Sequence, residues 1–201
     1  MAGAFPSTTI ASNSGPRDEF PRDYPALDGS VSLEGVAYAL ANAAEAVSIM
    51  KKYQPQMVVL MMGTNDASQG RAVEDYTKDA AQAVETILAT GAIPILSTIP
   101  PHIGRLELSK SYNESLRKLA RERKLPLIDY EREILTRRPD DWNGTLLGKN
   151  DVHPTAETGG EGGVKASSAP TEENLRSSGY LLRGWLSVRK IGEVKRTVLN
   201  P

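Results

Sequence analysis

The stretch MVVLMMGTND, residues 57–66, joins a continuous apolar run to a short polar segment. An unbroken apolar run is typical of a parallel strand that is covered on both faces, so we predict a strand over 57–62. The polar residues that follow would then lie at the carboxyl edge of the sheet. In open α/β sheets this edge is where ligands bind.

Strand and helix patterns alternate on both sides of this strand, which indicates a parallel sheet covered by helices. We predict strands over 7–11, 93–97 and 125–129, and helices over 37–53, 73–90 and 110–123. The fold class that follows is α/β: a single three-layer α/β/α domain over 1–201 with a flavodoxin-like parallel sheet.

The last third of the chain has a different composition. Residues 155–171 are rich in Gly, Ser and Ala, which predicts a flexible loop. Residues 172–199 have apolar side chains at helical spacing, which predicts one closing helix. We expect its buried stripe to consist of Leu181, Leu182, Trp185, Val188 and Ile191.

Composition excludes several classes of protein. The net charge of −1 gives no electrostatic case for binding nucleic acid or an anionic membrane. The chain has no cysteine, so disulfides and thiol nucleophiles are excluded. No apolar run approaches the length of about 18 residues that a membrane span needs. Residues 1–14 lack the pattern of a signal peptide, and the compartment stays open: cytoplasmic, or exported if the chain is truncated at its amino terminus.

A second segment with chemical potential is DVHP, residues 151–154. The His153 imidazole is the side chain best suited to act as a base near neutral pH, and Asp151 is close enough in sequence to orient it. The Asn65 amide could donate a hydrogen bond to an oxyanion. The alternatives are that Asp151 and Pro154 form a simple turn, and that Asn65 and Asp66 cap the next helix or form an Asx turn.

These two segments resemble blocks of the SGNH (GDSL-like) hydrolases, a family of α/β/α serine esterases and lipases. The Gly-x-Asn-Asp block matches Gly63 to Asp66. The Asp-x-x-His block matches Asp151-Val152-His153 with one residue fewer, so either Asn150 or Asp151 fills the acid position. The glycine of the second block matches Gly15, with Gly29 as the fallback.

The resemblance implies hydrolysis of a carboxylic ester, with a small acyl or carbohydrate group, through an acyl-enzyme. His153 would be the base and Asp151 the acid that orients it. Asn65 and Gly15 would form the oxyanion hole. His102 could line the substrate cleft. The partner is a small-molecule ester, and we expect no cofactor and no metal.

The Gly-Asp-Ser block that carries the family's nucleophile does not occur in this sequence. We weigh three explanations and favour the first: the chain is a piece of a longer protein whose first strand is missing. In the second, Ser14 or Ser30 is the nucleophile. In the third, the domain is not catalytic and binds a ligand or self-associates. An incomplete sheet would favour a homo-oligomer through its exposed edge.

Overall fold

A computed structural model describes residues 54–155, 157–158 and 163–199. Its main sheet is parallel, with strand order β1-β2-β3. The strands are β1 (Met57–Leu60), β2 (Ile93–Ser97) and β3 (Leu127–Ile128). β1 pairs with β2 through Leu60 and Leu96, and Leu96 is in turn the partner of Leu127 in β3. The parallel sheet predicted from the sequence is confirmed.

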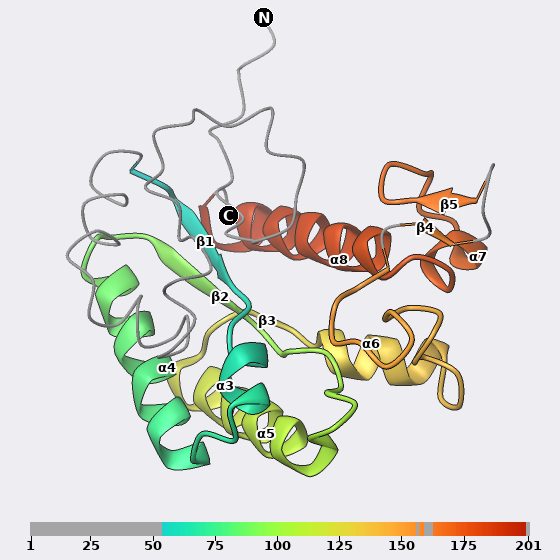
Figure 1. Ribbon diagram of the computed structural model, residues 1–201. Coiled ribbons are helices and arrows are strands. Elements are labelled where there is room, and N and C mark those ends of the chain that lie inside the picture. The colour runs from blue at the N-terminus through green and yellow to red at the C-terminus, as the bar shows by residue number, and fades with distance from the viewer. Residues whose placement is uncertain (1–53, 156, 159–162, 200–201) are drawn as a thin grey trace, which may run out of the picture.

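Helices cover both faces of this sheet (Figure 1). They are α3 (Thr64–Ser68), α4 (Val73–Leu88), α5 (Leu106–Arg123), α6 (Tyr130–Arg137), α7 (Glu172–Leu175) and α8 (Gly179–Val194), followed by a π-helical turn at Lys195–Leu199. Leu96 of β2 packs with α4 and α5, whereas its neighbour Ile95 packs with α6 and α8. Successive strand residues point to opposite faces, so the sheet separates two cores. This is the predicted three-layer α/β/α fold.

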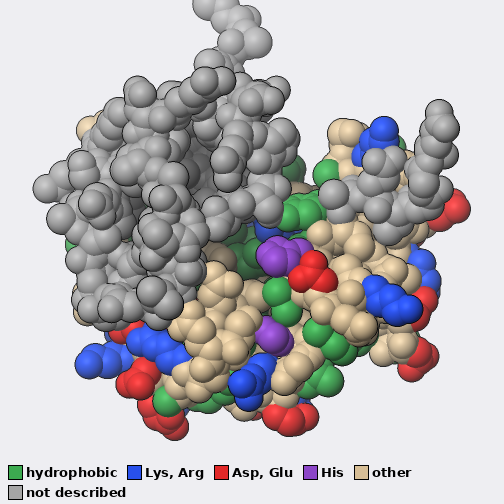
Figure 2. All heavy atoms as spheres, in the orientation of Figure 1, with side chains coloured by type: hydrophobic (Ala, Val, Ile, Leu, Met, Phe, Trp, Pro, Cys, Tyr) green, Lys and Arg blue, Asp and Glu red, His purple; other side chains and the backbone are tan. Residues whose placement is uncertain are grey.

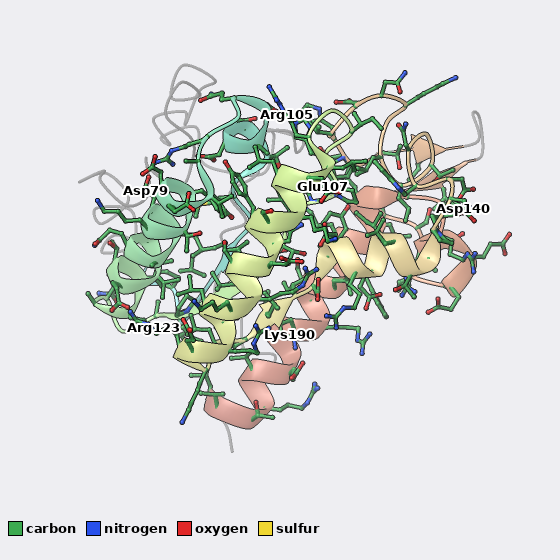
Figure 3. The ribbon with its side chains drawn as sticks, turned by 90° about the horizontal axis from the view of Figure 1, so that it is seen from below. Asp79, Arg105, Glu107, Arg123, Asp140 and Lys190 are labelled. Atoms are coloured by element: carbon green, nitrogen blue, oxygen red, sulfur yellow. The ribbon has the colours of Figure 1, made fainter. Side chains whose placement is uncertain are left out.

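The helices α4 and α5 lie side by side on one face of the sheet (Figure 3). The rings of Tyr76 and Tyr112 stack between them, with centroids 4.0 Å apart. At the other end of the pair, Arg123 of α5 forms an ion pair with Glu85 of α4. These contacts join α4 to α5 at both ends of the helix pair.

The turn from β1 into α3 depends on a glycine. Gly63 has φ +117°, a backbone conformation that L side chains rarely adopt. A Cβ atom at this position would lie 2.7 Å from the Tyr76 ring. The Tyr76 hydroxyl also donates a hydrogen bond to the carbonyl of Met62, over 2.9 Å. The strand end is therefore fastened directly to α4.

Two element boundaries on the α5 side differ from our predictions. The helix predicted over 110–123 begins four residues earlier, at Leu106. The prediction missed this turn because its two leucines do not form a buried stripe: Leu106 is 49% exposed and Leu108 is partly buried. The strand predicted over 125–129 is confined to Leu127–Ile128. Asp129 ends it by capping α6, where its carboxylate accepts a hydrogen bond from the Arg132 amide. We did not predict α6.

The carboxyl-terminal predictions also need correction. The segment 155–171, predicted as a loop, contains an antiparallel pair of short strands, β4 (Glu157–Thr158) and β5 (Val164–Lys165). The single helix predicted over 172–199 is divided into α7 and α8. Ser178 starts α8 as its N-cap, accepting a hydrogen bond from the Leu181 amide. Within the described ranges, no helix has the length and apolar character needed to cross a membrane.

Several predictions fall outside the described residues. They are the strand over 7–11, the helix over 37–53, and the residues Ser14, Gly15, Gly29 and Ser30. They stay predictions from the sequence.

Candidate functional site

The carboxyl edge of the sheet brings together the segments that follow β1 and β2. β1 leads through Gly63 into α3, which carries Asn65, and β2 leads to His102. A hydrogen bond between Ser68 of α3 and His102 joins the two segments. The chain has two histidines, and Figure 2 shows histidine side chains at two places on one face of the molecule. The α3 segment and His153 therefore belong to the same face.

Asn65 is exposed, and its side chain is not used to cap α3. The N-cap of this helix is Gly63, and no side chain there accepts a capping hydrogen bond. In the part of the chain that the structure describes, the Asn65 amide has no hydrogen-bond partner. The capping alternative raised from the sequence is therefore wrong for Asn65, whose side chain is exposed.

Asp66 points the other way, into the protein, and is fully buried. Arg71 binds it, with 3.0 Å between Arg71 Nη1 and Asp66 Oδ1, and also forms an ion pair with Asp79 of α4. Burial raises the pKa of Asp66, and the contact with Arg71 opposes that rise. The geometry of Asp66 is that of a structural residue that ties α3 to α4.

His153 and Asp151 form a hydrogen-bonded pair, with 2.8 Å between His153 Nδ1 and Asp151 Oδ1. The hydrogen bond with His153 holds the pKa of the Asp151 carboxyl below its usual range, so this carboxylate is ionised at neutral pH. An ionised carboxylate can only accept, so Nδ1 must carry the proton and Nε2 must be unprotonated in the neutral imidazole. The His153 side chain is 67% exposed, which leaves Nε2 open to a substrate.

The structure distinguishes the two residues that could fill the acid position. Asn150 has φ +55° and donates its backbone N–H to the Asn143 side-chain oxygen, over 2.7 Å. Its own side chain also faces Asn143. Asp151, in contrast, contacts the imidazole and accepts a further hydrogen bond from the Val152 amide over 2.7 Å. Of the two candidates, Asp151 is therefore the partner of His153.

The segment that carries this pair is anchored to α8. The Thr155 amide donates to the Leu146 carbonyl over 3.0 Å, and Leu146 is fully buried. From α8, the Gly179 amide donates to Thr155 Oγ1 over 3.1 Å, and the Tyr180 amide donates to the Thr155 carbonyl over 3.1 Å. His153 lies two residues before Thr155. Although its ring is exposed, its backbone is held by the fold.

A small residue at position 148 leaves room for the Asp151 carboxylate. A Cβ atom at Gly148 would lie 3.1 Å from Asp151 Cβ and 3.2 Å from Asp151 Oδ2. We expect Gly148→Ala to displace the carboxylate and weaken its bond to His153, so that the pKa of Asp151 rises toward its ordinary value. Carbon-detected NMR titration measures this pKa. Gly104→Ala, where a Cβ meets nothing within 4 Å, is the control and should leave it unchanged.

Ser68 is a residue of this edge that the sequence analysis missed. Its hydroxyl lies 2.8 Å from His102 Nε2. We placed His102 at the edge of a cleft, but the residue is only 8% exposed. Burial lowers the pKa of His102, and the charge of Arg105 acts in the same direction. The spacing of Ser68, three residues after Asn65 on a helix, could have indicated that the two share a face.

Comparisons with known proteins agree with this fold. Thioesterase 1/protease 1/lysophospholipase L1 of Escherichia coli K12 is 25% identical over 133 residues, which cover 65% of this chain and 58% of that protein. The chain thus spans less than two thirds of that relative's length. Among solved structures, a G-D-S-L family protein from Desulfitobacterium hafniense DCB-2 has a TM-score of 0.57 and 22% identity, covering 83% of this chain and 86% of its own.

A second solved structure shows the same fold at lower identity. The psychrotrophic esterase EstA from a Pseudoalteromonas species has a TM-score of 0.53 and 15% identity, covering 80% of this chain and 73% of its own. The model of the GDSL-like lipase/acylhydrolase family matches residues 16–158, which is more than half of the chain and includes both Asn65 and His153. With the fold, the sheet-edge motif and this match in agreement, the chain belongs to the GDSL-like lipase/acylhydrolase family.

Proposed function

We propose that this protein hydrolyses carboxylic esters, with His153 as general base, Asp151 as the residue that orients it, and Asn65 as an oxyanion donor. The observation that carries the proposal is the 2.8 Å contact between His153 Nδ1 and Asp151 Oδ1. It leaves Nε2 as an exposed base on the face that also includes α3. Membership of the GDSL-like lipase/acylhydrolase family supports an acyl substrate.

The proposed reaction has two steps. A serine hydroxyl attacks the ester carbonyl while His153 Nε2 takes its proton, and the tetrahedral oxyanion accepts a hydrogen bond from the Asn65 amide. The alcohol leaves with the proton from His153, and an acyl-enzyme remains. Water then attacks the acyl group, again with His153 as base, and releases the acid and the serine.

The serine is proposed from the sequence alone. Ser14 and Ser30 are the candidates, and Gly15 is the proposed second oxyanion donor. All three lie outside the described residues. The relative from Escherichia coli is described as a thioesterase and lysophospholipase. Thioesters should therefore be assayed as substrates together with oxygen esters that have short and long acyl chains.

Labelling with a fluorophosphonate, followed by peptide mass spectrometry, tests this proposal. The probe reacts with an activated serine and identifies it. Labelling of Ser14 or Ser30 that is lost in His153→Ala would support an ester hydrolase and name its nucleophile. Folded protein that takes no label and turns over no ester would reject hydrolysis by this chain and favour the alternative of a domain that binds a ligand without chemistry.

Replacing the oxyanion donor gives a further prediction. In an active preparation, Asn65→Ala should lower kcat by about 10²- to 10³-fold with a small change in KM, because the lost hydrogen bond forms mainly in the transition state. Steady-state kinetics with a p-nitrophenyl ester measure both constants. The control is Gln82→Ala, which removes an exposed side-chain amide from α4 and should leave both constants unchanged. An unaltered kcat in Asn65→Ala would remove Asn65 from the mechanism.

A further inference from the structure

The hydrogen bond between Ser68 and His102 connects two segments of the proposed site that are far apart in sequence. Ser68 is the last residue of α3, and His102 follows β2. Ser68 Oγ and His102 Nε2 are 2.8 Å apart. Ser68 is exposed, but His102 is only 8% exposed, so this contact is not a chance encounter of two surface side chains.

The direction of this hydrogen bond follows from the atoms around it. Ser68 Oγ lies 3.0 Å from the Thr64 carbonyl, and one hydroxyl proton can serve only one acceptor. His102 Nδ1 is buried and has no hydrogen-bond partner among the described residues. A proton on Nδ1 would be a buried, unpaired N–H, which is rarer in proteins than an unpaired acceptor. The proton therefore belongs on Nε2, which donates to Ser68, and Ser68 donates to Thr64.

We propose that His102 is a positioning residue that holds α3, and with it Asn65, in place by donating a hydrogen bond to Ser68. This inference rests on the proposed function, because the position of α3 matters for catalysis only if Asn65 is the oxyanion donor. Asn65 and Ser68 are three residues apart on one helix and lie on the same side of it. A helix of five residues has little stability of its own, so its orientation must come from its contacts.

α3 has such contacts on two sides. Asp66 is bound by Arg71 on the buried side, and Ser68 is bound by His102 on the side of Asn65. Arg105, at the start of α5, lies beside α3 in Figure 3, and a Cβ at Gly70 would come within 3.8 Å of its guanidinium. Without the bond to His102, α3 would keep its Asp66 anchor but could turn about it and move Asn65.

The competing interpretation is a catalytic pair in which His102 activates Ser68 as a nucleophile. It requires the reverse hydrogen bond, from Ser68 to an unprotonated Nε2, and therefore a buried Nδ1–H without a partner. Histidine ¹⁵N NMR on the complete chain separates the two, because the imidazole nitrogen shifts show which nitrogen carries the proton. We expect the Nε2–H tautomer for His102. The Nδ1–H tautomer would overturn the proposal.

Matched variants test the positioning role without depending on turnover. In His102→Gln the amide can still donate to Ser68, whereas His102→Ala and Ser68→Ala cannot form the bond. The readout is hydrogen exchange of the Ala67 and Gln69 amides, which donate to the carbonyls of Gly63 and Asn65. We expect about five- to tenfold faster exchange in both alanine variants and nearly unchanged exchange in His102→Gln. Ser111→Ala, which removes a serine hydrogen bond on α5, is the control.

Each outcome of the exchange and kinetic experiments either supports or overturns the positioning role of His102. Equal exchange in Ser68→Ala and the unmodified protein, or equal acceleration in His102→Gln and His102→Ala, would overturn the proposal. In an active preparation, His102→Gln should retain kcat, whereas His102→Ala should lower it as Asn65→Ala does. Loss of kcat in His102→Gln together with fluorophosphonate labelling of Ser68 would assign Ser68 as a nucleophile instead. If Asn65→Ala has no effect on kcat while the exchange results hold, the role of Asn65 is wrong and the positioning of α3 stands.

Discussion

His153→Ala is expected to lower kcat for ester hydrolysis by about 10²- to 10⁴-fold, the usual contribution of a general base. In the proposed mechanism the imidazole accepts the proton of the attacking hydroxyl and returns it to the leaving alcohol, so the variant loses both transfers. KM should change little, because the ring takes part in proton transfer rather than in binding the ground state. Steady-state kinetics on an active preparation measure the effect.

Two companion variants make this experiment specific. Asp151→Asn keeps the size of the side chain but removes the charge that holds the Nδ1 proton, so it should also lower kcat strongly. Lys149→Ala changes an exposed residue of the same segment and should leave kcat unaltered. Full turnover in His153→Ala would reject the proposed mechanism, whatever the other two variants show.

Gly179→Ala is expected to destabilise the protein by at least about 3 kcal/mol, a large fraction of the stability of a typical domain. A Cβ atom at this position would lie 1.9 Å from the carbonyl oxygen of Leu146, which is backbone and cannot rotate away. It would also lie 3.0 Å from Pro154. The first turn of α8 would have to move away from the segment that carries His153. Urea denaturation measures the loss of unfolding free energy.

The same helix provides the matched control. Gly184 also lies within α8, and a Cβ atom there meets nothing within 4 Å. Gly184→Ala should raise the free energy of unfolding by about 0.5–1 kcal/mol, because alanine favours the helix over glycine. If Gly179→Ala were as stable as Gly184→Ala, the close packing of α8 on Leu146 would be refuted.

The sequence predicted the fold best where a single structural requirement, such as burial in the sheet, limits the residue types at a position. The apolar run at 57–62 was predicted as a strand, and it contains β1 (Met57–Leu60). The glycine that follows it adopts a left-handed conformation against Tyr76, which the structure shows and the sequence analysis did not predict. The three-layer fold could be predicted because strand and helix patterns alternate along the chain. The sequence favoured Asp151 as the partner of His153 but left Asn150 open, because the two residues are adjacent. In the structure Asp151 contacts the imidazole, whereas the Asn150 amide donates to the Asn143 side chain.

Helices with polar faces were the main source of error. α6 escaped prediction because few of its residues are apolar; it is fixed by the Asp129 cap and by burial of Tyr130 and Ile134. In α8 the predicted stripe was wrong at Val188, which is 69% exposed, whereas Leu186 is buried. Both residues fit a helical period, and only the direction from which the sheet approaches α8 distinguishes them.

The attachment of Thr155 to the start of α8 has a consequence for the order in which the protein matures. During synthesis, β1, β2 and β3 leave the ribosome well before residues 179–194. The segment with Asp151 and His153 has by then also been made, but the helix that anchors Thr155 has not. The proposed base thus acquires its support last, so a nascent chain would already carry the sheet edge with Asn65 while still lacking a fixed imidazole.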